Sequence, residues 1–210
     1  MSSYERKDHF HQRARREGFR SRAAYKLAEI QKQHRLLRRG QCVIDLGCWP
    51  GGWLQVASHA VGSRGRVVGV DLVAIEPPLQ NENVIALCAD LTDSGLAPRL
   101  LEALGGAADV ILSDAAPKLT GVRVTDRVRE EAVLTAVAAL LPLLLRTGGD
   151  LLLKVLEGPE AQAVERSIRE AFERARALRP AATRRGSSER YLLARRFRPE
   201  AEGGRRRCEG

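Results

Sequence analysis

The sequence has no hydrophobic segment long enough to cross a bilayer. Its longest apolar run extends from Ala132 to Leu145 and is interrupted by Pro142, whereas a membrane-spanning helix needs about 20 consecutive apolar residues. Residues 1–20 are polar and lack the apolar core of a secretory signal. We therefore expect a cytoplasmic protein with no membrane partner, and a buried helix in the apolar run.

Cysteine pairs with the spacing of a metal site are also absent. The sequence contains no C-x-x-C pair, and its histidines are not close to the cysteines, which argues against a zinc centre. We expect no metal. The first three cysteines fall in or beside apolar strands, where we expect buried thiols of a reducing cytosol. The four cysteines are Cys42, Cys48, Cys88 and Cys208.

The dinucleotide-binding pattern G-x-G-x-x-G is missing as well. The run Val43–Leu46 predicts a buried strand, and the turn Gly47-Cys48-Trp49-Pro50-Gly51-Gly52 follows it. A helix is expected from Trp53 to Val61. A strand, a glycine turn and a helix N-terminus form a nucleotide-type pocket. Because this turn offers less backbone to a phosphate, it suits S-adenosyl methionine, which has none.

Positive charge dominates what the sequence does contain. Lys and Arg total 35 against 26 Asp and Glu, which gives a formal charge of +9 over 210 residues. This length predicts a single domain, and the charge indicates a polyanionic partner: RNA, DNA or anionic lipid. We expect a basic N-terminal arm over 1–20, the domain over 21–197 and a basic tail over 198–210. The aromatic residues of the arm either stack on bases or belong to a solvated tail.

Strand and helix patterns alternate along the domain. Strands are expected over residues 43–46, 66–72, 84–87, 109–114, 150–156, 176–179 and 191–197. Helices are expected over 21–37, capped by Ser21, and over 53–61, 96–104, 127–146 and 159–175, with Gly148-Gly149 ending the fourth. This order predicts an α/β, Rossmann-like fold with a mostly parallel seven-stranded sheet and a C-terminal antiparallel hairpin.

Carboxylates stand near the ends of three consecutive strands, at Asp45, Asp71 and Asp90. Ligands of open parallel sheets bind at the carboxyl ends of the strands. Asp71 follows Gly51 by 71 − 51 = 20 residues, the spacing at which an acid binds ribose hydroxyls in a βαβ unit. We therefore favour a shared pocket, although any one of these residues could instead cap a turn. A loop over 117–126 is expected to cover it.

Lys154 is unusual because it interrupts an otherwise apolar strand. A lysine there needs a partner or must face the pocket, since an unpaired buried charge is costly. Burial or a nearby cation favours the neutral amine, which can act as a general base. Asp114 ends the fourth strand and Glu189 precedes the last, so all three could face one edge. Lys26 lies at the edge of a helical apolar stripe, where a solvated side chain is the alternative.

Five motifs in this order carry a resemblance to a known family. They are Ser21–Leu27 (SRAAYKL), Asp45–Trp53 (DLGCWPGGW), Ser113–Pro117 (SDAAP), Leu153–Val155 (LKV) and Ser188–Tyr191 (SERY). The chain resembles the FtsJ/RrmJ (RlmE) family of ribosomal RNA ribose 2′-O-methyltransferases over roughly residues 19–197. It departs from the usual family pattern at Cys48-Trp49 and at Lys118.

The resemblance implies S-adenosyl-L-methionine as cofactor and a uridine ribose in the A-loop of large-subunit rRNA, on the assembled subunit, as substrate. It implies the catalytic tetrad Lys26, Asp114, Lys154 and Glu189. It implies donor contacts from Gly51, Trp53, Asp71, Asp90 and Asp114. The alternatives are a tRNA or mRNA-cap substrate, or a non-catalytic RNA-binding assembly factor. An NAD-dependent oxidoreductase is disfavoured by the glycine turn and the lack of a second domain. We expect a monomer.

Overall fold

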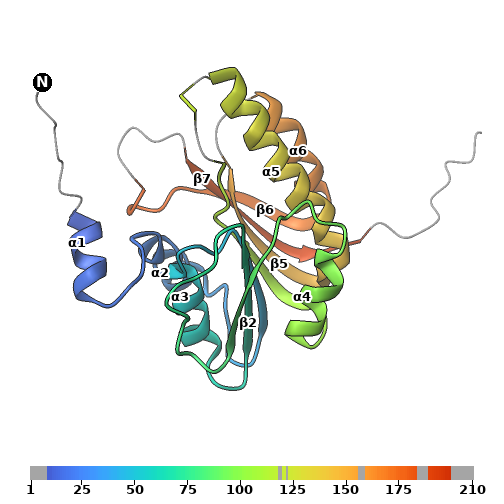
Figure 1. The fold of residues 1–210 in the computed structure, drawn as a ribbon. Coiled ribbons are helices and arrows are strands. Elements are labelled where there is room, and N and C mark those ends of the chain that lie inside the picture. Colours follow the sequence, from blue (N-terminus) through green and yellow to red (C-terminus); the bar gives the residue numbers. More distant parts are fainter. Residues whose placement is uncertain (1–8, 118–119, 122, 156–158, 184–188, 200–210) are drawn as a thin grey trace, which may run out of the picture.

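The computed structural model describes residues 9–117, 120–121, 123–155, 159–183 and 189–199. Within them, seven strands form one sheet in the order β3-β2-β1-β4-β5-β7-β6 (Figure 1). The strands are β1 (Cys42–Leu46), β2 (Arg66–Asp71), β3 (Val84–Cys88), β4 (Ala108–Ser113), β5 (Leu145–Val155), β6 (Phe172–Leu178) and β7 (Arg190–Phe197). The predicted tail at 198–210 lies almost wholly outside the described residues.

The first five strands pair in parallel, whereas β7 runs antiparallel to both β5 and β6. Helices lie in the crossovers from β1 to β2, from β3 to β4 and from β4 to β5, as is usual for parallel strands, whereas the described connection from β2 to β3 is irregular. Strands β6 and β7, with no helix in the described part of their connection, then close the sheet as an antiparallel pair. The predicted α/β, Rossmann-like fold, mostly parallel and with a C-terminal antiparallel hairpin, is confirmed.

Helices cover both faces of the sheet (Figure 1). Apolar residues of α2 and α3 pack on one face, and those of α4, α5 and α6 pack on the other. The helices are α1 (His9–Arg16), α2 (Ala23–His34), α3 (Gly52–Val61), α4 (Leu96–Leu104), α5 (Arg123–Leu144) and α6 (Pro159–Glu170). Burial on both faces explains why β1, β2 and β4 are nearly continuous apolar runs. No helix of the described residues is long and apolar enough to cross a membrane.

The predicted end of the long helix over 127–146 is wrong. Helix α5 ends at Leu144, and β5 begins at Leu145 instead of Asp150. Leu145 is buried in the core and pairs with Ala108, before a register irregularity that precedes Val110. Gly148, at φ +76°, lies inside this irregular strand segment. The glycines therefore shape the entry to the strand and do not terminate the helix.

Three local predictions also need correction. Helix α2 begins at Ala23 without a side-chain cap from its N-cap residue, so Ser21 is not the cap, and it ends at His34, where Arg35 has φ +47°. Helix α5 already starts at Arg123, within the loop expected over 117–126. Cys88 is exposed, because it ends β3, a strand at the edge of the sheet. Lys118 lies outside the described residues.

Candidate active site

The four residues of the expected tetrad come from four elements that meet at the carboxyl edge of the parallel strands. Asp114 directly follows β4, and Lys154 is the penultimate residue of β5. Glu189 directly precedes β7, whose antiparallel register places Tyr191 opposite Lys154. Lys26 lies on α2, on the face that packs against the sheet. The sheet topology therefore brings together residues separated by up to 163 positions in sequence.

The tetrad forms two largely buried lysine–carboxylate pairs. Lys154 Nζ lies 3.1 Å from a carboxylate oxygen of Asp114, with side-chain exposures of 9% and 18%. The same ammonium also donates a hydrogen bond to the main-chain carbonyl of Asp114. In the second pair, Lys26 Nζ donates to a carboxylate oxygen of Glu189. Charges held away from water interact more strongly than exposed ones, so each lysine is fixed in one position.

Tyr191 joins the two pairs, a role that the sequence analysis did not assign. Its hydroxyl lies 2.8 Å from Asp114 Oδ1 and 2.9 Å from Glu189 Oε1, and it accepts a hydrogen bond from Lys26 Nζ at 3.2 Å. A phenol has one proton to donate, so it serves one carboxylate at a time. The sequence did contain a signal for this role. Glu189 and Tyr191 are two residues apart, and residues at this spacing along a strand lie on the same face of the sheet.

The environment of the cluster keeps the phenol of Tyr191 protonated and the carboxylate of Glu189 ionised. Burial, followed by the charges of Asp114 and Glu189, raises the pKa of Tyr191. Burial alone would raise the pKa of Glu189, but the hydrogen bond and charge of Lys26, with smaller contributions from Tyr191 and Lys154, outweigh it and lower that pKa. The site therefore presents a hydrogen-bond donor between two anions and two cations, in a region with little water.

The glycine turn lies beside this cluster. Gly47 has φ +81°, and a Cβ there would lie 2.6 Å from the Cα of Ala115, so only glycine allows the turn to approach the segment after β4. Gly51 has φ +106°. The two residues that depart from the family pattern point in different directions: Cys48 is buried, whereas Trp49 is 55% exposed. The bulk of the indole therefore lies outside the packed core.

Asp71 and Asp90 lie at the carboxyl ends of the neighbouring strands, as predicted. Asp71 accepts hydrogen bonds from the amides of Trp49, at 3.0 Å, and Val73, at 3.1 Å. A carboxylate has about four lone-pair positions, so two remain for a ribose diol. Asp90 uses Oδ1 to accept from the amide and hydroxyl of Thr92, and the Thr92 amide is the main cause of its lowered pKa. Its second oxygen remains available to a ligand.

Asp45 does not face an open pocket, so this part of the sequence prediction is wrong. Its side chain is 0% exposed, and among the described residues neither oxygen has a hydrogen-bond partner. It pairs in register with Gly69 and Leu112, in the interior of the sheet. Burial, followed by the charges of Asp114 and Asp71, raises its pKa well above the usual value. Asp45 is therefore a core residue whose surroundings oppose its ionisation.

Trp53, an expected donor contact, has its side chain in the core. The indole is 3% exposed, packs 5.8 Å from the ring of Tyr191 between centroids, and donates to the main-chain carbonyl of Ala23 at 2.9 Å. Its hydrogen-bonding capacity is thus used within the protein. The indole of Trp53 supports the tetrad through its contact with Tyr191. Only the main chain of Trp53 is left to contact a ligand.

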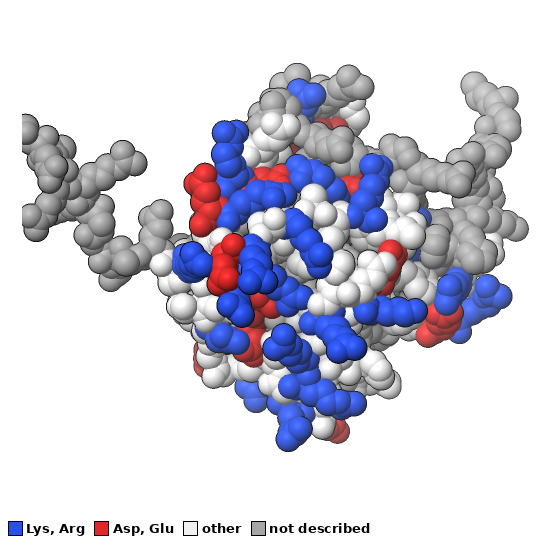
Figure 2. All heavy atoms as spheres, turned by 180° about the vertical axis from the view of Figure 1, so that it is seen from behind, with Lys and Arg blue, Asp and Glu red and all other residues white. Residues whose placement is uncertain are grey.

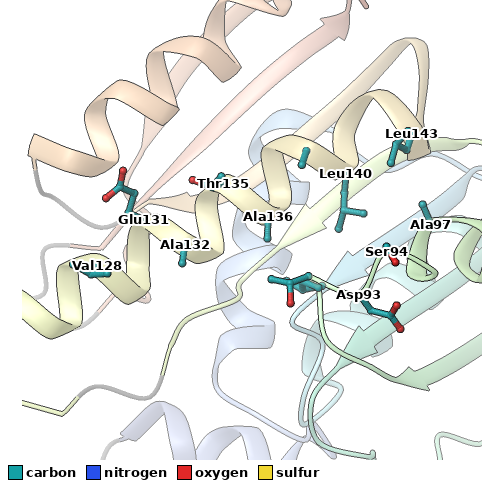
Figure 3. A pocket seen from close by; sticks show the side chains of 13 residues that line it. Asp93, Ser94, Ala97, Val128, Glu131, Ala132, Thr135, Ala136, Leu140 and Leu143 are labelled. Atoms are coloured by element: carbon teal, nitrogen blue, oxygen red, sulfur yellow. The ribbon is translucent and has the colours of Figure 1, made fainter.

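A separate hollow of about 600 Å³ lies between α5 and the start of α4. Figure 3 shows its lining of small and apolar side chains, with carboxylates at Asp93 and Glu131. It contains no member of the tetrad and no lysine or arginine. It therefore offers no paired lysine and carboxylate of the kind found at the tetrad, and the tetrad edge remains the candidate active site.

These features are typical of one class of proteins, the α/β methyltransferases: a Rossmann-like sheet, a glycine turn after its first strand, and acids at the ends of the next two strands. The chain matches the family model of the FtsJ-like methyltransferases over residues 19–197. It is 38% identical over 193 residues to the ribosomal RNA large subunit methyltransferase E of Methanothermobacter thermautotrophicus, covering 92% of this chain and 91% of that protein. It is 40% identical over 188 residues to the protein of the same name from Pseudomonas aeruginosa, covering 89% of each.

This protein belongs to the FtsJ-like methyltransferase family. The membership confirms the expected class of enzyme and S-adenosyl-L-methionine as its cofactor. A crystal structure described as that of a ribosomal RNA methyltransferase from Plasmodium falciparum has a TM-score of 0.74 at 24% identity, covering 85% of this chain and 98% of that chain. Aeropyrum pernix fibrillarin, crystallised with S-adenosyl-L-methionine, has a TM-score of 0.58 at 16% identity, covering 83% and 74%. These two likenesses concern the fold.

Proposed function

We propose that this protein transfers a methyl group from S-adenosyl-L-methionine to a ribose 2′-hydroxyl of large-subunit rRNA. The proposed target is a uridine of the A-loop in the assembled subunit, and the enzyme acts as a cytoplasmic monomer. The observation that carries the proposal is the pair of buried lysine–carboxylate contacts, Lys154–Asp114 and Lys26–Glu189, at the carboxyl edge of the sheet. The relatives named as large-subunit rRNA methyltransferases support the choice of RNA.

The tetrad suits the activation of a hydroxyl group. Bound S-adenosyl-L-methionine supplies an electrophilic methyl group. Lys154 would act as the general base and accept the proton of the 2′-hydroxyl, whose oxygen would then take the methyl group that the donor supplies. Lys26 places positive charge near the developing alkoxide. Asp114 and Glu189 hold the side chains of the two lysines in position through the contacts described above.

The donor is proposed to lie across the turn and the neighbouring strand ends. Gly51 and the main chain of Trp53 approach it, and Asp71 accepts from the ribose hydroxyls through its two remaining lone-pair positions. Asp90 offers its second carboxylate oxygen, and Asp114 links the donor site to the tetrad. The lack of a side chain at Gly51 and the half-buried carboxylate of Asp71 support this placement.

The test is the transfer of labelled methyl from S-adenosyl-L-methionine to unmethylated large subunits, stripped rRNA and tRNA in parallel. We expect label in the subunit, mapped to a single ribose. Label in tRNA alone would replace the substrate, and donor binding without transfer to any RNA would favour a non-catalytic assembly factor.

The base assignment is tested with Lys154→Met, which keeps the length of the side chain. General-base catalysis is typically worth about 10²–10⁴-fold, and we expect kcat to fall by that factor. Lys32→Met is the matched control, because Lys32 is exposed on the same helix as Lys26. Turnover of Lys154→Met near that of the control would show that another group takes the proton.

A further inference from the structure

A basic hollow lies at the amino ends of β1 and β2, at the end of the sheet away from the tetrad. Its volume is about 850 Å³, and its charged lining residues are Arg39, Arg64, Arg66 and one carboxylate, Glu82. Figure 2 shows Lys and Arg side chains crowded over the lower part of the rear face, whereas Asp and Glu are sparse there. Such a surface attracts polyanions.

No carboxylate of the described residues forms an ion pair with the arginines of this region. Arg39 and Arg64 line the hollow, and Arg38 is the exposed neighbour of Arg39. None of the three forms an ion pair with any described residue. By contrast, Arg195 at the C-terminal hairpin pairs with Asp150. Uncompensated guanidinium groups on a concave surface have unused donors in the planar arrangement that matches a phosphate.

The floor of the hollow is held by a polar network. Ser58, which is buried, donates to Asn83 at 2.7 Å and accepts from Asn81 at 3.1 Å, and Asn83 donates to the carbonyl of Gly62 at 3.0 Å. A Cβ on Gly62 would lie 2.8 Å from Nη1 of Arg39. The absence of a side chain there lets the guanidinium rest against the main chain. A group positioned in this way loses less conformational entropy on binding.

The distance between the hollow and the tetrad limits the kind of ligand that can contact both. Strand β1 has 5 residues, which span about 16 Å at about 3.3 Å per residue. The hollow and the tetrad therefore lie at opposite ends of the sheet, too far apart for one nucleotide to occupy both. A ligand that uses both must be a long polyanion that follows the surface between them.

We propose that Arg38, Arg39 and Arg64 bind backbone phosphates of the RNA substrate at a second position, remote from the methylated ribose. This inference rests on the proposed function, because it takes the polyanion to be the RNA that is methylated. The second contact anchors a large RNA and leaves the chemistry at the tetrad unchanged.

The test replaces the three arginines together by glutamine, as R38Q/R39Q/R64Q. The control R99Q/R166Q/R198Q removes the same charge from exposed positions on α4, on α6 and directly after β7. Binding of stripped large-subunit rRNA is measured from low to high salt. Each lost phosphate contact lowers the salt slope by about 0.7–0.9, so we expect a slope smaller by about 2–3 and affinity reduced about tenfold to a hundredfold at 0.1 M salt.

Turnover separates this role from catalysis. We expect KM for the ribosomal acceptor to rise by about the same factor, whereas kcat, donor affinity and melting temperature stay as in the control. An affinity and salt slope equal to those of the control would overturn the proposal. So would binding of adenosine monophosphate that requires the three arginines while RNA binding does not. Because RNA binding is measured without turnover, failure of the proposed methylation remains distinguishable.

Discussion

Replacement of Tyr191 by phenylalanine tests whether one hydroxyl holds the two halves of the active site together. The ring is fully buried and packs against Trp53, and phenylalanine keeps that ring without leaving a cavity. The change removes one donor that lies 2.8 Å from Asp114 and 2.9 Å from Glu189. A hydrogen bond to a charged group contributes about 1.5–3 kcal/mol.

Each carboxylate retains its lysine in the Tyr191→Phe variant, so neither becomes an unpaired buried charge. The decrease in the free energy of unfolding should therefore lie in the lower part of that range, at about 2 kcal/mol. A domain of about this size loses about 2–4 °C in Tm per kcal/mol, which gives a decrease of about 4–8 °C. We also expect kcat to fall by about tenfold or more, because misplacement of reacting groups is costly, whereas donor affinity changes little.

The assay is thermal unfolding together with methyl transfer at saturating donor. Tyr25→Phe is the matched control, since the Tyr25 hydroxyl bonds to Glu17 at 2.8 Å in an exposed position and its loss should cost little. A melting temperature and kcat for Tyr191→Phe that match those of Tyr25→Phe would refute the bridging role.

Two further substitutions test buried carboxylates by their pH dependence. Burial raises the pKa of Asp45, so the unfolded chain loses this proton at a lower pH than the folded chain does, and the fold loses stability as pH rises above the ordinary aspartate pKa of about 4. Asp45→Asn should therefore melt higher than the wild type, by a margin that grows as pH rises above about 4. The pH dependence expected for Glu165 has the opposite sign. Burial alone would raise the pKa of Glu165, but its hydrogen bonds and charge contacts with Arg190 and Arg169 outweigh burial and lower the pKa. Ionised Glu165 therefore stabilises the fold above pH 4.5, and this stabilisation is lost as pH falls below that value. Glu165→Gln should cost about 2 kcal/mol at pH 7, with a difference that narrows in acid; denaturant unfolding at several pH values checks both signs, and pH-independent differences would contradict them.

Much of the candidate active site was predictable, because its residues lie at or near the ends of strands. A lysine in an apolar strand cannot remain unpaired, so Lys154 had to have a partner, and the alternation of strands and helices placed Asp114 at the same edge. The fold class followed from the same alternation. The identity of each partner was not predictable, because it depends on which strands are neighbours: Lys154 pairs with Asp114, and Lys26 with Glu189.

The failures share a physical cause, which is that local patterns do not report long-range packing. The i,i+4 spacing of Glu165 and Arg169 predicts an exposed pair on the surface of α6. Arg190 from β7 also bonds to Glu165, however, and the carboxylate is buried between the two arginines. Asp45 resembles the other acids at strand ends, yet it lies one residue before the end of β1 and is sealed between its neighbours. Tyr191 gained its role from the antiparallel register with β5.

The insertion of β7 between β5 and β6 has a consequence for how the enzyme is made. Strand β6 precedes β7 in the sequence but cannot join the sheet until β7 lies between it and β5. During synthesis β5 therefore presents an unpaired edge, which is a surface prone to wrong pairing. The strand that covers this edge also brings Glu189 and Tyr191 to the lysines. Protection of the growing sheet and the onset of activity thus depend on the same late docking event.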